Sequence, residues 1–226
     1  MNQNLKSEPM KSIEIIRAGF TTLLAVAAVG AQAGQPGYYA GVHGGRNDVK
    51  DWNASVSLGA IVTLPGTVGA ERAAHWGVFG GRQTENARFE VEYQWGNFDI
   101  TSIQLGALQQ AVAKEGDYRA LMLNAYRTYD FNERFTGYAG LGIGWGEVKL
   151  PQMGFSGGCN CFPAADKSGF AYQGRIGAEW HITPRHNAFL QYTSIRLPRP
   201  ASGGTPGVTY SRKSVGTISI GYRHQF

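Results

Sequence analysis

The stretch 214–226 reads S-V-G-T-I-S-I-G-Y-R-H-Q-F, with a regular alternation of side-chain character. Its alternate positions form a mostly apolar and a mostly polar set, Gly216, Ile218, Ile220, Tyr222, His224 and Phe226 against Thr217, Ser219, Gly221, Arg223 and Gln225. A period of two is typical of an extended strand with two different faces. The stretch also closes on an aromatic residue. We therefore expect a strand whose apolar face contacts lipid and whose end lies in an aromatic girdle.

The same alternation appears in seven earlier stretches of the chain. The clearest is 88–98, where Phe, Val, Tyr and Trp alternate with Glu, Gln and Gly. The expected strands are 38–46, 75–82, 88–98, 118–131, 135–149, 169–182, 187–197 and 214–226. The clear ones reach the roughly 9–11 residues that a tilted strand needs to cross a bilayer.

The connections between these strands alternate between long and short. The long ones are 47–74, 99–117, 150–168 and 198–210, and the short ones are 83–87, 132–134 and 183–186. A membrane barrel has short turns at its periplasmic rim and long loops outside the cell. The sequence therefore predicts an all-β fold, an eight-stranded antiparallel up-and-down transmembrane β-barrel with both ends in the periplasm.

The composition supports this class of protein. Only 16% of the 226 residues are charged, while 12% are aromatic and 32 are glycine. This balance is unusual for a cytosolic enzyme and typical of an antiparallel all-β wall. The net charge of +5 comes from scattered bases, which argues against a nucleic-acid partner. No apolar run approaches the roughly 20 residues of a transmembrane helix, but alternating barrel strands would not produce one.

The N-terminal segment has the pattern of a secretory signal peptide. Basic residues precede a short apolar stretch, and small residues then follow at the spacing of a cleavage site. The residues concerned are Lys11, Arg17, 18–29, Ala31 and Ala33.

Cleavage after Ala33 would divide the chain into a signal peptide, residues 1–33, and a barrel domain, residues 34–226. A start at Met10 would give a more ordinary signal length than a start at Met1, and both remain open. An exported barrel of this kind belongs in the outer membrane of a Gram-negative bacterium.

The charged residues of the strands are too sparse to cover a water-exposed surface, so we expect them inside the barrel and the large apolar side chains in lipid. Eight strands leave an interior that side chains fill. Buried carboxylates and guanidinium groups must pair. The expected lumen polar network consists of Glu90, Glu92, Arg175, Glu179 and Arg223. A gated ion path through the same pairs is the alternative.

Six segments of the chain resemble a known family. They are Y-Y-A-G-V-H-G-G from Tyr38, R-F-E-V-E-Y from Arg88, L-M-L-N-A-Y from Leu121, Y-A-G-L-G-I-G-W-G from Tyr138, F-A-Y-Q-G-R-I-G-A-E-W from Phe170, and G-Y-R-H-Q-F from Gly221. Together they resemble the small OmpA-like eight-stranded outer-membrane proteins, which include Gram-negative surface antigens and porin-like proteins. The chain departs from full-length OmpA because it shows no periplasmic peptidoglycan-binding domain, so a wall-tethering role is not implied.

The C-terminal strand also resembles the assembly signal of outer-membrane barrels, which implies the barrel-assembly machinery as a partner during biogenesis. The residues that carry this likeness are Ser219, Gly221, Tyr222 and Phe226. His224 departs from the pattern, which prefers an apolar residue there.

Cys159 and Cys161 are the two cysteines of the chain and lie in the long connection 150–168. An oxidising compartment favours a disulfide between them, although so small a ring gains little loop entropy. Free or intermolecular thiols are the alternative. Two thiols are too few for a metal site, and we assign no metal, cofactor-binding or catalytic residue.

A lipid A-modifying enzyme is the rival class of function. Such an enzyme would need a nucleophile with a base in reach. The candidates are Ser194 or Ser211 with His43, His181 or His224. His181 and His224 fall near the periplasmic strand ends and Ser194 near the outer end, so we expect scattered interfacial histidines and no enzyme.

These patterns favour a structural or surface role in the outer membrane. Bases in the long connections would meet lipopolysaccharide phosphates; they are Lys50, Arg72, Lys167, Arg199, Arg212 and Lys213. We expect a monomer that contacts outer-membrane lipid and lipopolysaccharide, contributes to membrane integrity and offers long loops for adhesion. A narrow porin-like channel is the second hypothesis.

Overall fold

The computed structural model describes residues 36–59 and 61–226. The expected signal peptide and its cleavage residues Ala31 and Ala33 lie outside the described residues. The strands are β1 (Tyr38–Asp48), β2 (Trp52–Ser57), β3 (Thr63–Glu71), β4 (Ala74–Gln83), β5 (Ala87–Leu105), β6 (Leu108–Asn132), β7 (Phe135–Leu150), β8 (Ala165–His181), β9 (His186–Arg196), β10 (Ala201–Ser202), β11 (Gly207–Tyr210) and β12 (Ser214–Gln225). Among the described residues, no helix is long and apolar enough to cross a membrane.

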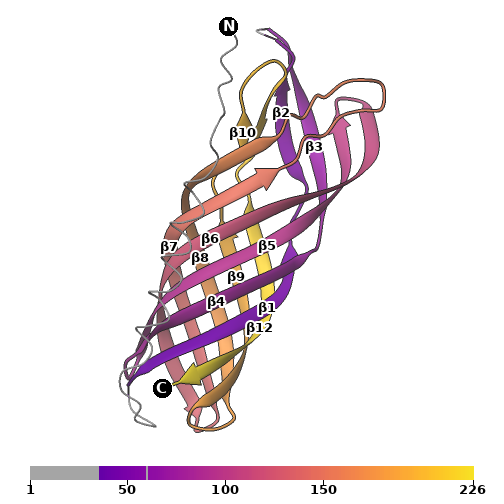
Figure 1. Cartoon of the computed structure of the whole chain (residues 1–226). Coiled ribbons are helices and arrows are strands. Elements are labelled where there is room, and N and C mark those ends of the chain that lie inside the picture. The colour runs from indigo at the N-terminus through magenta and orange to yellow at the C-terminus, as the bar shows by residue number, and fades with distance from the viewer. Residues whose placement is uncertain (1–35, 60) are drawn as a thin grey trace, which may run out of the picture.

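Eight strands close into a tilted barrel, shown in Figure 1. Their order around the ring is β1, β4, β5, β6, β7, β8, β9 and β12, and every neighbouring pair is antiparallel. The last strand pairs back to the first, from Tyr39 opposite Gln225 to Asp48 opposite Gly216. The eight-stranded antiparallel barrel predicted from the sequence is therefore confirmed.

The outer ends of the strands differ from the prediction. The stretch 99–117, expected as a long loop, continues β5 and β6 to a tight turn at Gly106, whose φ of 59° lies in the left-handed region. A bulge between Ile100 and Ser102 shifts the register of the pair. A bulge adds one residue to the strand, so the buried side chains change from even-numbered to odd-numbered positions. The buried series of Phe98 and Ile100 therefore continues at Ile103, and this break in the alternation hid the strand in the sequence.

The long connection 47–74 also forms strands above the barrel. β2 pairs with β3, and β3 pairs with the outer half of β5. The expected loop 198–210 supplies β10 and β11, of which β11 pairs with β2. Figure 1 shows this outer sheet at the end of the barrel opposite the C-terminus.

The outer surface of the barrel carries an apolar band between two groups of aromatic side chains. Trp76, Trp95, Trp145 and Phe170 are exposed towards the outer end, and Tyr129, Phe131, Phe135 and Trp180 towards the turns. Between them lie exposed aliphatic side chains, including Leu141, Ile176 and Ile220. This is the lipid-facing pattern of a transmembrane barrel.

The barrel interior has two tiers. The tier near the short turns is polar and charged, whereas the outer tier is an apolar cluster that continues into the outer sheet. Its largest fully buried members are Trp52, Tyr118, Tyr210, Phe98 and Phe162. The alternation of the strands does not predict this second tier, because most of its members lie in stretches expected to be loops.

Candidate functional site

Arg175 of β8 forms the centre of the polar tier. Its Nη2 atom donates to Oε1 and Oε2 of Glu92 on β5, at 2.6 Å and 2.7 Å. Its Nη1 atom lies 3.4 Å from Oε1 of Glu90. Glu92 is completely buried, so both partners depend on this contact for compensation of their charge.

A second ionic cluster surrounds Glu179 of β8. The Nε atom of Arg223 on β12 donates to Glu179 Oε1 at 3.1 Å, and Arg223 Nη2 contacts the same oxygen. Arg88 Nη1 donates to Glu179 Oε2 at 2.6 Å. The structure thus brings together all five residues of the expected network in two clusters and adds Arg88, which the sequence analysis missed. Arg88 is two residues before Glu90 on β5, so its side chain points to the same inward face as Glu90 and Glu92. This alternation could have identified Arg88 from the sequence.

Side-chain amides form a further layer that sequence reasoning also missed. Gln94 Nε2 donates to Gln173 Oε1 at 2.7 Å, and Gln173 Nε2 donates to Glu92 Oε2 at 3.0 Å. Asn124 Nδ2 donates to the same Glu92 oxygen at 2.9 Å. Together these groups fill the lumen around the carboxylate. The cavity that remains between the two ionic clusters measures about 20 Å³, which is room for about one water.

His43 is not one of the scattered interfacial histidines that the sequence predicted. It is buried in the lumen, and its Nε2 atom lies 2.7 Å from Glu92 Oε1. The reason is its position on the inward face of β1, opposite the acidic face of β5. His181 bonds to Thr136 and Asn187 instead. Within residues 36–59 and 61–226, no histidine hydrogen-bonds to a serine.

The apolar tier closes the outer end of the lumen. The rings of Trp52 and Phe98 pack edge to face with centroids 4.8 Å apart, and the Tyr210 ring is tilted against Trp52 with centroids 6.2 Å apart. Burial among these groups raises the pKa of the Tyr210 hydroxyl. Polar networks below and aromatic packing above thus occupy both tiers of the barrel interior.

The residues of the expected assembly signal lie on both faces of β12. Ser219 is buried and Tyr222 is exposed. A Cβ atom at Gly221 would lie 2.2 Å from Cζ of Phe189, so the aromatic ring of β9 occupies the space above this glycine. The backbone N–H of Phe226 donates to Tyr38 O at 2.9 Å.

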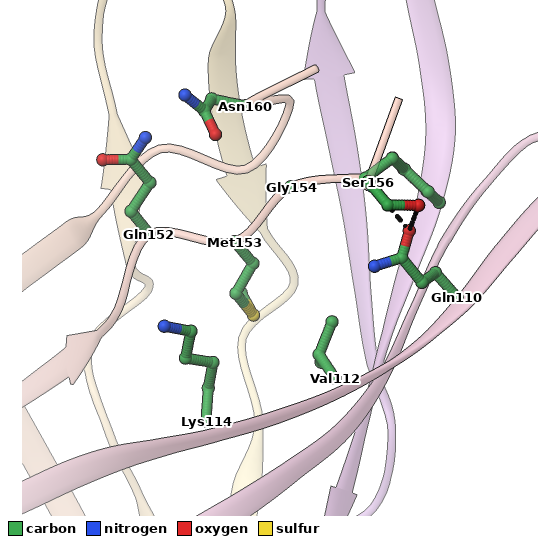
Figure 2. A pocket seen from close by; sticks show the side chains of 9 residues that line it. Gln110, Val112, Lys114, Gln152, Met153, Gly154, Ser156 and Asn160 are labelled. Carbon is green, nitrogen blue, oxygen red and sulfur yellow. Dashed lines mark hydrogen bonds between the residues drawn. The ribbon is translucent and has the colours of Figure 1, made fainter. Parts of the chain in front are cut away.

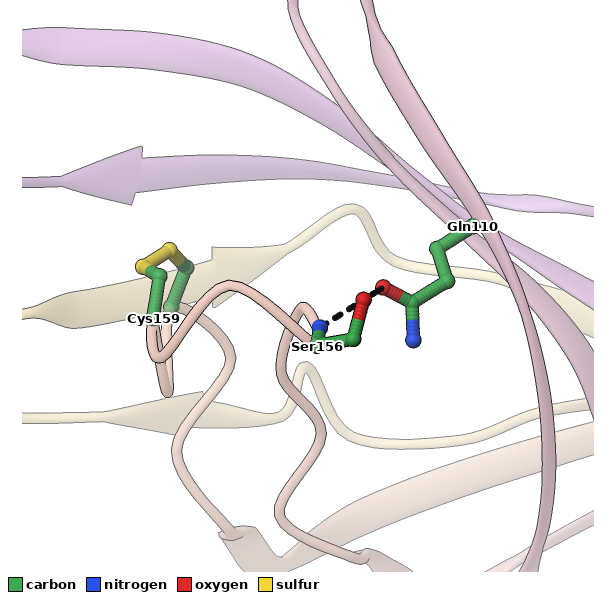
Figure 3. Close-up of a disulfide and its surroundings, with 4 residues drawn as sticks. Gln110, Ser156 and Cys159 are labelled. Carbon is green, nitrogen blue, oxygen red and sulfur yellow. Dashed lines mark hydrogen bonds between the residues drawn. A yellow bond between two sulfur atoms is a disulfide. The ribbon is translucent and has the colours of Figure 1, made fainter.

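An open groove lies on the extracellular part, between β6 and the segment after β7 (Figure 2). Its volume is about 420 Å³. Gln110 of β6 spans to this segment, because its Oε1 atom accepts from Ser156 N at 2.8 Å and from Ser156 Oγ at 3.1 Å. The structure joins Cys159 and Cys161 in a disulfide on the same segment, as Figure 3 shows.

Comparison with known proteins identifies relatives of this architecture. Residues 19–223 match the family model described as the outer membrane protein beta-barrel domain. Neisserial surface protein A (NspA) is similar in structure, with a TM-score of 0.51 and 15% identity over 84% of this chain and 97% of that chain. This likeness supports the fold alone. No curated protein matches the chain.

Two further solved structures are similar at lower scores. Outer membrane protein AlkL in DMPC bilayers has a TM-score of 0.49 and 18% identity, over 100% of this chain and 97% of that chain. The outer membrane protease OmpT from Escherichia coli has a TM-score of 0.48 and 8% identity, over 87% of this chain and 99% of that chain. A barrel fold does not by itself distinguish an enzyme from other barrels, because function depends on the sites that the fold carries.

Proposed function

The chain belongs to the outer membrane protein beta-barrel domain family and lies in the outer membrane, and from this premise we propose that it is a surface protein whose barrel anchors an ordered extracellular platform. The filled lumen supports the wall mechanically. The outer sheet contacts lipopolysaccharide and molecules outside the cell. In this proposal the protein is neither a channel nor a lipid A-modifying enzyme.

The filled lumen is the observation that carries the proposal. Arg175 and Glu92 join β8 to β5 across the interior, and Arg223 and Glu179 join β12 to β8. These pairs connect segments far apart in the sequence, so they fix the cross-section of the barrel. An ion path would require these buried pairs to separate, which costs several kcal/mol for each uncompensated charge.

The outer sheet supports the surface role. Its strands share the buried cluster around Trp52, Val68 and Tyr210, so it is packed as a small domain rather than as separate loops. Five of the six basic side chains expected to meet lipopolysaccharide are exposed, and Lys50, Arg72 and Arg212 lie in the connections between the barrel strands and the outer sheet. Bases at such a boundary gain from anionic headgroups.

Planar-bilayer conductance of the purified protein tests the proposal. We expect no stable unitary currents, with the protein recovered in the outer-membrane fraction and heat-modifiable in its gel mobility. Stable, large unitary currents would overturn the filled-lumen function and favour the porin-like alternative. The enzyme alternative is tested by mass analysis of lipid A from cells with and without the protein, where we expect identical species.

A further inference from the structure

The groove beside β6 is built by an unpaired strand edge. β6 pairs with β5 from Leu108 onwards but with β7 only from Asp117 onwards. Its edge over 108–116 is therefore paired on one side. Backbone N–H and C=O groups on such an edge require partners from solvent or a ligand.

Three polar side chains line the groove and have no side-chain partner among the described residues. They are Lys114 on β6 and Gln152 and Asn160 on the facing segment. Within the part of the chain that the structure describes, none of the three forms an ion pair or a side-chain hydrogen bond. Lys149, by contrast, pairs with Glu147 at 3.2 Å. Figure 2 shows the Lys114 amine on the opposite side of the groove from the two amides.

Apolar groups complete the lining of the groove. Val112 and Phe155 are partly buried and contribute apolar side chains, whereas Met153 beneath them belongs to the buried core cluster. A mixed lining of this kind is complementary to a ligand that has both an apolar face and polar edges. The volume of about 420 Å³ falls in the range of small-ligand sites, roughly 300–1,000 Å³.

The segment opposite β6 is closely fitted around Asn160. A Cβ atom at Gly154 would lie 2.9 Å from Asn160 Oδ1 and 2.4 Å from Cys159 O. Asn160 lies between the two cysteines of the disulfide. The Gln110–Ser156 hydrogen bonds connect the segment to β6. The groove is therefore preformed, which lowers the entropy cost of binding.

We propose that this groove binds an acidic sugar unit, a hexose ring that carries a carboxylate or a phosphate. Lys114 pairs with the anion, and the amides of Gln152 and Asn160 bond to ring hydroxyls. Val112 and Phe155 contact the C–H face of the ring. The inference rests on the proposed surface function and assigns it a ligand class, which lipopolysaccharide core or an external polysaccharide could supply.

The test compares three sugars that share one ring: glucose, glucuronate and glucose 6-phosphate. Each is titrated into the folded full-length barrel in detergent micelles, and binding is measured by saturation-transfer NMR. A single sugar at an open groove binds with a Kd on the order of millimolar. We expect glucuronate and glucose 6-phosphate to bind and glucose to bind at least about tenfold more weakly, because a charge-assisted bond is lost.

Two groove variants and one control identify the site. Lys114→Gln should weaken glucuronate about tenfold and leave glucose unchanged. Gln152→Ala should weaken both sugars. Lys149→Gln removes the same charge from β7, outside the groove, and should leave all three sugars unchanged. Equal binding of glucose and glucuronate, no binding at all, or equal effects of the two lysine variants would overturn the proposal.

The source of the sugar is decided by two further probes, purified lipopolysaccharide and hyaluronan, a polymer that contains glucuronate. Sensitivity to Lys114→Gln with either probe supports the site and identifies its source, whereas insensitivity with both overturns it. The conductance and fractionation of Lys114→Gln should match those of the unmodified protein. A failure of the sugar proposal is thus distinct from a failure of the proposed function.

Discussion

The guanidinium of Arg175 donates to both carboxylate oxygens of Glu92 from the opposite side of the lumen, at 2.6 Å and 2.7 Å. The pair joins β8 to β5, two strands that are not neighbours in the ring. Burial makes this contact stabilising only while both partners are present.

Replacing Arg175 by Met should lower the free energy of unfolding by about 3–5 kcal/mol, because Glu92 is left buried and uncompensated. Urea unfolding in micelles, followed by gel mobility, measures the change. The double variant Arg175→Met/Glu92→Gln should recover part of the loss. Arg119→Met is the matched control, since Arg119 bonds Glu147 at 2.5 Å on the partly exposed outer surface and should cost no more than about 1 kcal/mol.

Gly221→Ala should reduce the yield of assembled barrel. Its new methyl group would lie 2.2 Å from Phe189 Cζ and 2.6 Å from Val42 O, an overpacking that costs about 1–3 kcal/mol. The heat-modifiable fraction of outer-membrane protein measures this. Gly174→Ala is the control, because the nearest atom to its Cβ is Leu141 Cδ2 at 3.8 Å. Equal yields from the two variants would contradict the prediction.

Deleting Phe226 should impair assembly far more than His224→Tyr does. Phe226 supplies the N–H that bonds Tyr38 O at 2.9 Å and so extends the closing pair β1–β12 by one bond. His224 packs its ring against His186 and Phe226, and its Nδ1 atom lies 3.4 Å from the Tyr222 hydroxyl. A tyrosine can make the same ring contacts, so only this long hydrogen bond is altered. Pulse-labelled insertion into the outer membrane compares the two. Unimpaired insertion of the deletion variant would remove the special role of the terminal aromatic residue.

Trp52→Ala should loosen the outer sheet without unfolding the barrel. Loss of a fully buried indole costs about 3–5 kcal/mol, and Trp52 contacts Phe98 and Tyr210 above the lumen. Proteolysis of intact cells should then cleave the outer strands while the heat-modifiable barrel persists. Trp76→Ala, which removes an exposed indole from the lipid face, should leave the proteolysis pattern unchanged. Protection of Trp52→Ala equal to that of the unmodified protein would show that the sheet does not depend on this side chain.

Alternation in the sequence was sufficient to identify the ring and its two faces. Each residue of the expected lumen network lies inside the barrel, because successive side chains of a strand point to opposite faces and the apolar ones identify the lipid face. The outer half of β5 was hidden for the same reason, since the bulge after Ile100 breaks the parity. A single irregular residue thus converted a strand into an apparent loop.

The partners across the lumen could not be predicted from the chain alone. Gln173 meets Glu92 and Asn124 because the stagger of the ring brings three strands to one height. That stagger is a property of the closed barrel and not of any one strand. The burial of His43 beside Glu92 follows from the same geometry, whereas its side of β1 was already visible in the sequence.

The pairing of β1 with β12 has a consequence for how the barrel forms. Tyr39 and Gln225 are opposite one another, although nearly all of the described chain lies between them. Contacts of such high sequence separation form slowly. A chain that lacked β12 would leave β1 and β9 with unpaired backbone groups in hydrocarbon, which the bilayer does not tolerate. The stable inserted state therefore requires the last strand, and until that strand is in place the open edges of β1 and β9 need protection from aggregation.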